Sequence, residues 1–281
     1  MIVADFRIFI FYMKQLSIIT INYNNKSGLQ KTIDSVIQQT YTQYEWIIID
    51  GDSTDGSKRL LTKYSNYFSH CISEKDKGIY DAMNKGIKIA SGKYLLFLNS
   101  GDYLYENTTL EKVFSKNYDV DYINGNIVKV LNNKIVEYDY GIHSENITCF
   151  DLLKFGLNHQ STFINKKLFD KYGLYDDKLK LISDWKFFFH TMIFGQCSLK
   201  YINLNIAFFD ISGRSNNKGN LSLHRKEKEE YLNSVLPSKI IEDYKFTLCY
   251  NEVRKYKLSR ILFSLLYRIV IIYEKIKFKH N

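Results

Sequence analysis

The chain has 281 residues, enough for one large domain or for a domain with an extension, and its 45% hydrophobic content is ordinary for a folded globular protein. A single proline and a 16% share of aromatic residues exclude a proline-rich linker and argue against disorder. The formal net charge of +9 favours an anionic partner, such as nucleotide phosphates, a membrane surface or nucleic acid.

The cysteines and histidines give no sign of a metal centre. The four cysteines lie far apart without a CxxC pair, and the six histidines show no ligand spacing, so we expect reduced thiols in the cytosol. The apolar residues 1–13 carry Asp5 and Arg7 and lack a small-residue cleavage site, which makes a poor signal peptide and too short a membrane span. We expect an N-terminal extension here, with residues 1–12 preceding a more natural start at Met13.

Short β-rich runs alternate with helical periods from residue 16, which is typical of parallel βαβ units. Strands are expected at 16–22, 44–50, 70–73 and 94–98, with helical periods at 29–37, 57–68 and 79–90. The sequence therefore predicts an α/β fold with a mostly parallel, Rossmann-like sheet flanked by helices.

Beyond residue 103 the alternation is less regular. A hairpin is expected at Asn132-Asn133, a strand at 158–164, and a helix at 183–194 capped by Ser183 or Asp184. Two further helical segments, 224–232 and the basic 254–281, close the chain. We expect one domain over 14–215 and a helical extension over 216–281.

Polar residues follow successive strands at the edge where ligands bind in open α/β sheets. Asp50 ends the second strand, the stretch from Asp76 to Lys85 follows the third, and Asp102 follows the fourth. Each stretch alone also suits a helix cap or a turn, which we favour for Asp55 and Ser57. The occurrence of all three at neighbouring strand ends favours a ligand site.

Two carboxylates are candidates for chemistry. Asp102 could bind a divalent cation whose other positions are filled by water and diphosphate, with an Asx turn as the alternative. Asp184 lies between an apolar pair and Trp185, so desolvation would raise its pKa toward that of a general base, with a helix cap as an equal alternative.

Five stretches occur in the order seen in one enzyme family: "LSIITINYNN", "IIIDGDSTDGS", "GIYDAMNKGIKIASGKYLLFLNSGDYL", "NHQSTFI" and "ISDW". Over about residues 15–215 the chain resembles family 2 glycosyltransferases of the GT-A fold, especially bacterial enzymes of capsule, O-antigen and colanic-acid type assembly. The resemblance implies that Asp50 meets the nucleotide base, that Asp102 holds Mn²⁺ or Mg²⁺ on the diphosphate, and that Asp184 deprotonates the acceptor hydroxyl.

The resemblance also implies a wider set of contacts. The further residues expected to bind the donor nucleotide are Thr20, Asn22, Tyr23, Asn24, Asp52, Lys77, Asp81, Asn84, Lys85 and Ser100. His159, Gln160 and Trp185 are expected to touch the donor sugar or the acceptor, although a lone histidine is more often a structural hydrogen bonder.

The sequence departs from the family pattern in three places. The usual Asp-x-Asp-Asp reads Asn99-Ser100-Gly101-Asp102, so only the last carboxylate remains. Met83 stands where many members have arginine, which leaves Lys77 or Lys85 to meet phosphate charge. The usual Asp-Asp-Gly-Ser reads Asp50-Gly51-Asp52-Ser53.

The resemblance predicts an inverting transfer of a hexose-type sugar from a nucleoside diphosphate, most often UDP, to a lipid-linked glycan in surface polysaccharide biosynthesis. One alternative is a nucleotidylyltransferase, which would carry a Gly-rich basic loop after the first strand that "NYNNKSG" does not provide. Another is a catalytically impaired GT-A scaffold that binds a membrane surface or a partner. Nucleic-acid binding rests on charge alone and ranks last.

The basic tail is the expected membrane contact. The apolar run at 258–273 is broken by Arg260 and Arg268, so it should not span a bilayer. One helical face would combine Leu262, Leu265, Leu266, Ile269 and Tyr273. This face would lie on anionic lipid at the inner side of the plasma membrane, or would pack on the catalytic domain or on a second copy in a homodimer.

Overall fold

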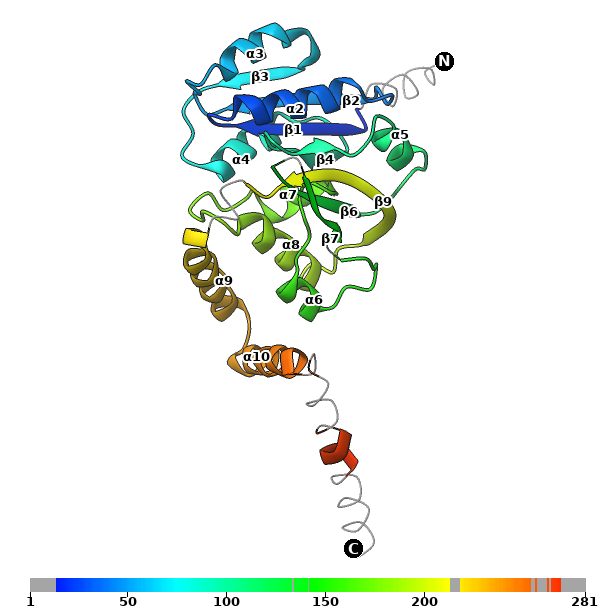
Figure 1. The fold of residues 1–281 in the computed structure, drawn as a ribbon, viewed down its shortest axis with the longest axis vertical. Coiled ribbons are helices and arrows are strands. Elements are labelled where there is room, and N and C mark those ends of the chain that lie inside the picture. Colours follow the sequence, from blue (N-terminus) through cyan, green and yellow to red (C-terminus); the bar gives the residue numbers. More distant parts are fainter. Residues whose placement is uncertain are drawn as a thin grey trace, which may run out of the picture. The chain divides into compact units, whose positions relative to one another are not determined.

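The computed structural model describes residues 14–132, 134–140, 142–212, 218–253, 256, 262 and 264–268 (Figure 1). The chain divides into two compact units, one ending at Lys228 and one beginning at Glu229. The expected boundary between residues 215 and 216 stays a prediction. The N-terminal extension and most of the amphipathic segment at 258–273 lie outside the described residues.

The first half of the first unit is a parallel sheet with intervening helices. Its elements are β1 (Leu16–Asn22), α2 (Lys26–Ile37), β2 (Tyr44–Asp50), α3 (Ser57–Lys63), β3 (His70–Ser73), α4 (Ile79–Ile89) and β4 (Tyr94–Phe97). β1 pairs in parallel with β2 and β4, and β2 pairs in parallel with β3. The expected strands are confirmed, β4 ending one residue early. The helix expected at 57–68 is shorter because the chain turns into a 3₁₀ segment, η2 (Ser65–Tyr67).

The second half is mixed, which explains its irregular sequence pattern. Its elements are β5 (Tyr103–Leu104), α5 (Thr109–Phe114), β6 (Tyr122–Leu131), β7 (Lys134–Tyr140), α6 (Cys149–Lys154), β8 (Thr162–Asn165), α7 (Lys167–Tyr172), α8 (Ser183–Ile193), β9 (Leu199–Asp210) and η4 (Lys218–Asn220). The boundary between the units falls within α9 (Leu221–Val235), and α10 (Ser238–Val253) belongs to the second unit. Antiparallel β8 joins β4 to β6, so both halves share one sheet in the order β3-β2-β1-β4-β8-β6-β9-β5. The expected hairpin is confirmed as β6 and β7, with Asn132 at a φ of 51°.

One hydrophobic cluster contains buried residues from both halves. In α2 the buried residues Leu29, Ile33 and Val36 recur at helical spacing and pack against the sheet, which Figure 1 shows beneath this helix. Trp46 and Phe163 are buried in the same core from β2 and β8. The rigid sheet therefore fixes the positions of the strand ends on which the polar residues lie.

Two further expectations can be settled. The expected cap of α8 by Ser183 or Asp184 is wrong, because the residue before the helix is Ile182 and no side chain caps it. In the described part of the chain, no helix combines the length and the apolar composition needed to cross a membrane.

Candidate active site

Asp50 at the end of β2 is fully buried and is held by three donors. Its carboxylate accepts hydrogen bonds from Asn22 Nδ2 at 2.7 Å, from the Ser53 amide at 3.0 Å and from Ser73 Oγ at 2.7 Å. Burial alone would raise the pKa of Asp50, but the hydrogen bonds from Ser53, Ser73 and Asn22 outweigh it, so this pKa lies below its usual value. Asp50 is therefore an ionised, fixed acceptor at the sheet edge.

Gly51 brings two further side chains to this edge. A Cβ atom at Gly51 would lie 3.0 Å from Asp76 Oδ2 and 3.1 Å from Tyr23 Cδ2, so both side chains surround this position closely. The Tyr23 ring is 55% exposed, and Asn22 Oδ1 is buried without a hydrogen-bond partner among the described residues. An exposed ring beside unsatisfied or ionised acceptors suits a flat heterocycle that carries N–H donors.

Lys85 is the centre of an acidic cluster rather than an isolated cation. Its Nζ lies 2.7 Å from Glu74, 2.6 Å from Asp76 and 3.7 Å from Asp81. Although burial opposes it, these carboxylates raise the pKa of Lys85 well above its usual value. Lys85 therefore neutralises the carboxylates beside Gly51, and its expected phosphate contact stays a prediction.

Other expected nucleotide contacts lie in varied surroundings. The side-chain amide of Asn84 bonds the backbone of Tyr175 twice, because Nδ2 donates to the Tyr175 carbonyl and Oδ1 accepts from the Tyr175 amide, which braces α4. Thr20 lies inside the sheet, where Trp46 Nε1 donates to its hydroxyl. Asn24 bonds the loop at residues 53–54, while Asp52 is exposed and paired with Lys58, and Lys77 is exposed. The nucleotide roles of these residues stay predictions.

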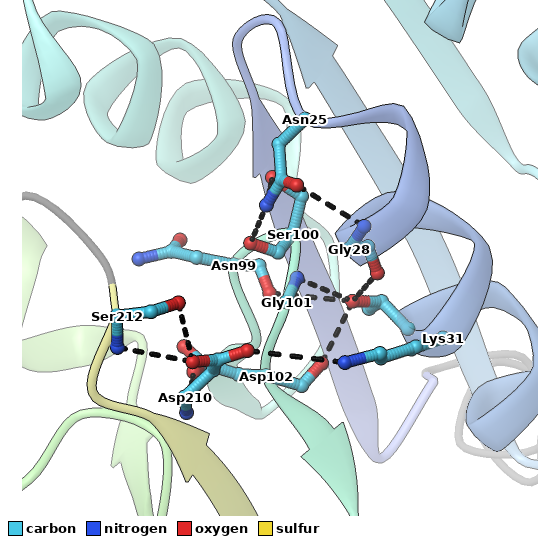
Figure 2. Close-up of polar contacts among 10 residues, drawn as sticks. Asn25, Gly28, Lys31, Asn99, Ser100, Gly101, Asp102, Asp210 and Ser212 are labelled. Atoms are coloured by element: carbon cyan, nitrogen blue, oxygen red, sulfur yellow. Dashed lines mark hydrogen bonds and ion pairs between the residues drawn. The ribbon is translucent and has the colours of Figure 1, made fainter. Parts of the chain in front are cut away.

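The turn after β4 is bonded to α2, as Figure 2 shows. Asn25 Nδ2 donates to the Ser100 carbonyl at 2.8 Å, and Thr32 Oγ1 donates to the Asp102 carbonyl at 2.7 Å. Gly101 adopts a φ of 108°, a region that favours glycine, and its amide donates to Thr32. This backbone conformation accounts for a glycine where the family pattern has a carboxylate.

Asp102 is buried beside the end of β9. The Asp210 amide, at the end of β9, donates to Asp102 Oδ1 at 3.2 Å (Figure 2). The side chain of Gln160 also donates to Asp102. Burial raises the pKa of Asp102 to about 7, with nearby Asp210 adding to the rise and His159 opposing it. A bound cation would favour the ionised form of this carboxylate.

The residues of the turn after β4 fit a divalent cation whose other ligands are oxygens of a diphosphate and of water. Asp102 would supply an oxygen ligand, and Asn99 Oδ1, in the same turn, is buried without a partner among the described residues. No group of three or more His, Cys, Asp or Glu side chains gathers as a metal site in the described part of the chain. Mg²⁺ usually has one or two ligands from the protein, and water and phosphate oxygens fill its other positions.

Asp184 lies in the first turn of α8 and is bonded on both carboxylate oxygens. Tyr80 of α4 donates to Oδ1 at 2.8 Å, and His159 Nδ1 lies 2.7 Å from Oδ2. Burial would raise the pKa of Asp184, but these two residues and the Trp185 amide lower it below the usual value. The expected rise of this pKa is therefore wrong, because the sequence shows the apolar neighbours and not the distant donors.

His159 also faces the Asp102 turn, since its Nε2 lies 3.3 Å from Asn99 Nδ2. Trp185 is more enclosed: its Nε1 donates to the Leu152 carbonyl at 2.8 Å, and Lys228 Nζ lies 4.3 Å from the ring centre. Burial lowers the pKa of Lys228 to about 8. The expected sugar contacts of His159, Gln160 and Trp185 stay predictions.

The structure thus brings several expected residues to one edge. They are Asn22, Asp50, Ser100, Asp102, His159, Gln160 and Asp184. Sequence reasoning missed Tyr80 and Asp210. Asp210 follows a strand and precedes "ISG", the same kind of signal as Asp102, whereas Tyr80 looked like part of an apolar helix face.

The model of the family described as "Glycosyl transferase family 2" matches residues 17–173. The chain belongs to this family. It is a glycosyltransferase, and the family expected from the five sequence stretches is confirmed. The narrower assignment to capsule, O-antigen or colanic-acid enzymes stays a prediction.

Curated relatives of this glycosyltransferase include mycobacterial proteins. A "PGL/p-HBAD biosynthesis glycosyltransferase" of Mycobacterium tuberculosis strain H37Rv is 28% identical over 215 residues, which cover 72% of this chain and 78% of that protein. An uncharacterized glycosyltransferase of the same strain is 47% identical over 88 residues, which cover 31% of this chain and 34% of that protein.

Solved structures share the fold. TarS residues 1–349 of S. aureus in complex with UDP superposes with a TM-score of 0.58 at 17% identity, over 70% of this chain and 60% of that one. The mannosyltransferase PcManGT of Pyrobaculum calidifontis, in complex with GDP-Man and Mn²⁺, gives a TM-score of 0.54 at 12% identity, over 73% and 59%. The expected GT-A fold is thereby confirmed.

Proposed function

We propose that this glycosyltransferase moves a sugar, with inversion, from a nucleoside diphosphate sugar to a hydroxyl group of a glycan. The observation that carries the proposal is the pair of carboxylates at one sheet edge, Asp102, which is buried, and Asp184, which is partly buried. One carboxylate has a pKa raised by burial and the other a pKa lowered by donors. Two neighbouring acids whose environments separate their pKa values suit a cation ligand and a proton acceptor.

UDP is the proposed donor nucleotide. Tyr23, Asp50 and Asn22 offer a ring, an ionised acceptor and an unsatisfied acceptor at the edge where a base would lie. Two TarS structures were solved with UDP and with UDP-GlcNAc, and PcManGT was solved with GDP-Man, so donors of this class occur on the same fold.

The proposed reaction displaces the diphosphate in one step. The acceptor oxygen forms a bond to the anomeric carbon while the bond to the diphosphate oxygen breaks, and the electron pair leaves with the nucleoside diphosphate. Asp184 accepts the hydroxyl proton, for which it must be ionised at the start. A divalent cation held by Asp102 would stabilise the negative charge that develops on the leaving diphosphate.

The proposed acceptor is a lipid-linked glycan in surface polysaccharide biosynthesis, reached from the cytoplasmic side of the plasma membrane. The name of the mycobacterial relative refers to PGL and p-HBAD biosynthesis. The net charge of +9, together with the exposed side chains Leu262, Leu265 and Leu266, supports contact with an anionic membrane surface. The other part of the expected apolar face lies outside the described residues.

The donor can be tested by a thermal-shift panel of UDP-, GDP- and dTDP-sugars with and without Mn²⁺. A ligand that binds the folded state raises the melting temperature by mass action. We expect the largest shift with a UDP-sugar and Mn²⁺, and a smaller shift for Asp102→Asn. Binding without any release of UDP, in water or with glycan acceptors, would favour the alternative of a catalytically impaired scaffold.

A further inference from the structure

His159 connects the two carboxylate sites through its two ring nitrogens. Nδ1 lies 2.7 Å from Asp184 Oδ2, and Nε2 lies 3.3 Å from Asn99 Nδ2. The ring is 6.4 Å from Phe97 at an interplanar angle of 90°, an edge-to-face contact that restricts its orientation. Because both ring nitrogens and the ring itself are in contact with neighbouring side chains, the His159 ring has little freedom to rotate.

The partners determine which nitrogen carries the proton. The Asn99 amide nitrogen can only donate, so Nε2 accepts from it and Nδ1 must carry the proton that is donated to Asp184. Asn99 is itself part of the Asp102 turn, since the Asp102 amide donates to the Asn99 carbonyl at 2.9 Å. The histidine therefore links the proposed base to the turn that carries the proposed cation ligand.

We propose that His159 is a positioning residue, which keeps Asp184 ionised and holds its carboxylate in a fixed orientation toward the acceptor hydroxyl. This inference rests on the function proposed above. It replaces the direct contact with sugar that the sequence suggested for His159.

The donors also restrict the approach of the acceptor hydroxyl. An ionised carboxylate has about four lone-pair sites, two on each oxygen. Tyr80 takes a site on Oδ1 and His159 takes a site on Oδ2. The acceptor hydroxyl can therefore approach only from the remaining directions.

The same donors set the protonation of the base. The charged or titratable groups near Asp184 are His159, Tyr80 of α4, Tyr175 of the loop before α8 and His224 of α9. Without the donor from His159, burial would weigh more heavily and the pKa of Asp184 would rise. The acidic limb of the pH dependence of kcat should then move to higher pH.

Two substitutions separate the two ring contacts. His159→Asn keeps a donor near the position of Nδ1 and loses the reach to Asn99. His159→Gln keeps a group near Nε2 and loses the donor to Asp184. His143→Gln is the matched control, since His143 is exposed and stacks on Tyr201 with 5.8 Å between ring centres.

The readout is UDP release from a UDP-sugar in water with Mn²⁺, as a function of pH, in the full-length protein. We expect His159→Gln to move the acidic limb of kcat up by about one pH unit, so that kcat falls by about tenfold on that limb and by much less at neutral pH. His159→Asn should keep the wild-type limb, and the UDP thermal shift should be the same in all variants. Wild-type limbs in both variants would overturn the inference.

A second readout does not depend on turnover. Nitrogen-15 NMR of the histidine rings, with the His159 signal assigned by its loss in His159→Gln, should show a proton on Nδ1. A ring protonated on Nε2 alone would overturn the inference. If the wild type neither binds nor hydrolyses any nucleotide sugar, the proposed function fails, while the NMR result still decides the contact between His159 and Asp184.

Discussion

The amide of Asp210 donates a hydrogen bond of 3.2 Å to the carboxylate of Asp102, and this bond ties the end of β9 to the turn after β4. The Asp210 carboxylate lies 3.9 Å from Lys31 of α2 and accepts from the Ser212 amide at 3.0 Å (Figure 2). The carboxylate of Asp102 is thus bonded directly to β9, and Asp210 in turn links this contact to α2. Asp102 is nevertheless a buried acid, which has a measurable cost.

The first prediction concerns the stability of Asp102→Asn in the presence of EDTA. The pKa of Asp102 rises from 3.8 to about 7 on folding, which corresponds to roughly 4 kcal/mol at 1.36 kcal/mol per unit. Between pH 4 and pH 7 the unfolded chain loses this proton while the folded chain keeps it, so the wild type loses stability as the pH rises. Asp102→Asn should not lose stability in this way, because asparagine does not titrate.

We therefore expect Asp102→Asn to melt several degrees above the wild type at pH 8 and close to it at about pH 4, because 1 kcal/mol shifts the melting temperature by about 2–4 °C at this size. Asp119→Asn is the control, since the Asp119 side chain is fully exposed. A variant that melts below the wild type at pH 8 would contradict the prediction.

The second prediction concerns Glu45, which joins β1, β2 and the segment before β4. Its carboxylate accepts from Ser17 Oγ at 2.5 Å, from the Ser91 amide at 2.5 Å and from the Gly92 amide at 3.2 Å. Burial would raise the pKa of Glu45, but hydrogen bonds from Ser17, Ser91 and Gly92 lower it overall. This stabilisation is present above the unfolded pKa and is lost as the pH falls through the folded pKa.

Glu45→Gln should lower the free energy of unfolding by about 2–3 kcal/mol at pH 7, because an amide group would face backbone donors. The difference in the free energy of unfolding between Glu45→Gln and the wild type should narrow toward pH 4. Urea titrations at pH 7 and at pH 4 would measure this difference. Glu137→Gln, at a half-exposed position, should change little. An equal loss of unfolding free energy at pH 7 and pH 4 would argue against a stabilising role for the charge of the Glu45 carboxylate.

The third prediction concerns Gly51→Ala. The added methyl group would lie 3.0 Å from Asp76 Oδ2 and 3.1 Å from the Tyr23 ring, so both side chains must move. We expect calorimetry to give UDP binding weaker by about tenfold, or 1.4 kcal/mol, with a nearly unchanged melting temperature. Unchanged affinity would place the nucleotide base elsewhere.

The regular half of the fold was predictable from sequence because its signals are local. Strands β1, β2 and β3 end where the alternation of β-rich runs and turns predicts, and Asp50 and Asp102 lie at strand ends for the same reason. The later half was less predictable. β5 has two residues, and β9 pairs with β6 in parallel although 67 residues separate Leu131 from Leu199, so the pairing leaves no local pattern.

The chemistry of Asp184 shows the same limit. Leu181, Ile182 and Trp185 are apolar residues near it in the sequence, and they predicted a raised pKa. Its donors, Tyr80 and His159, come from positions 104 and 25 residues away, and only the folded chain brings them within 2.8 Å and 2.7 Å. A local pattern can thus identify a buried acid but not the groups that determine its charge.

The most direct test of the account is the turnover of Asp184→Asn. Asparagine keeps the size of the side chain but cannot accept the proton, so we expect UDP release from a UDP-sugar to fall by about 10²–10⁴-fold. The UDP thermal shift should stay at the wild-type value, which shows that the donor site is intact. Turnover within a few-fold of the wild type, in folded protein that still binds UDP, would contradict the assignment of Asp184 as the base.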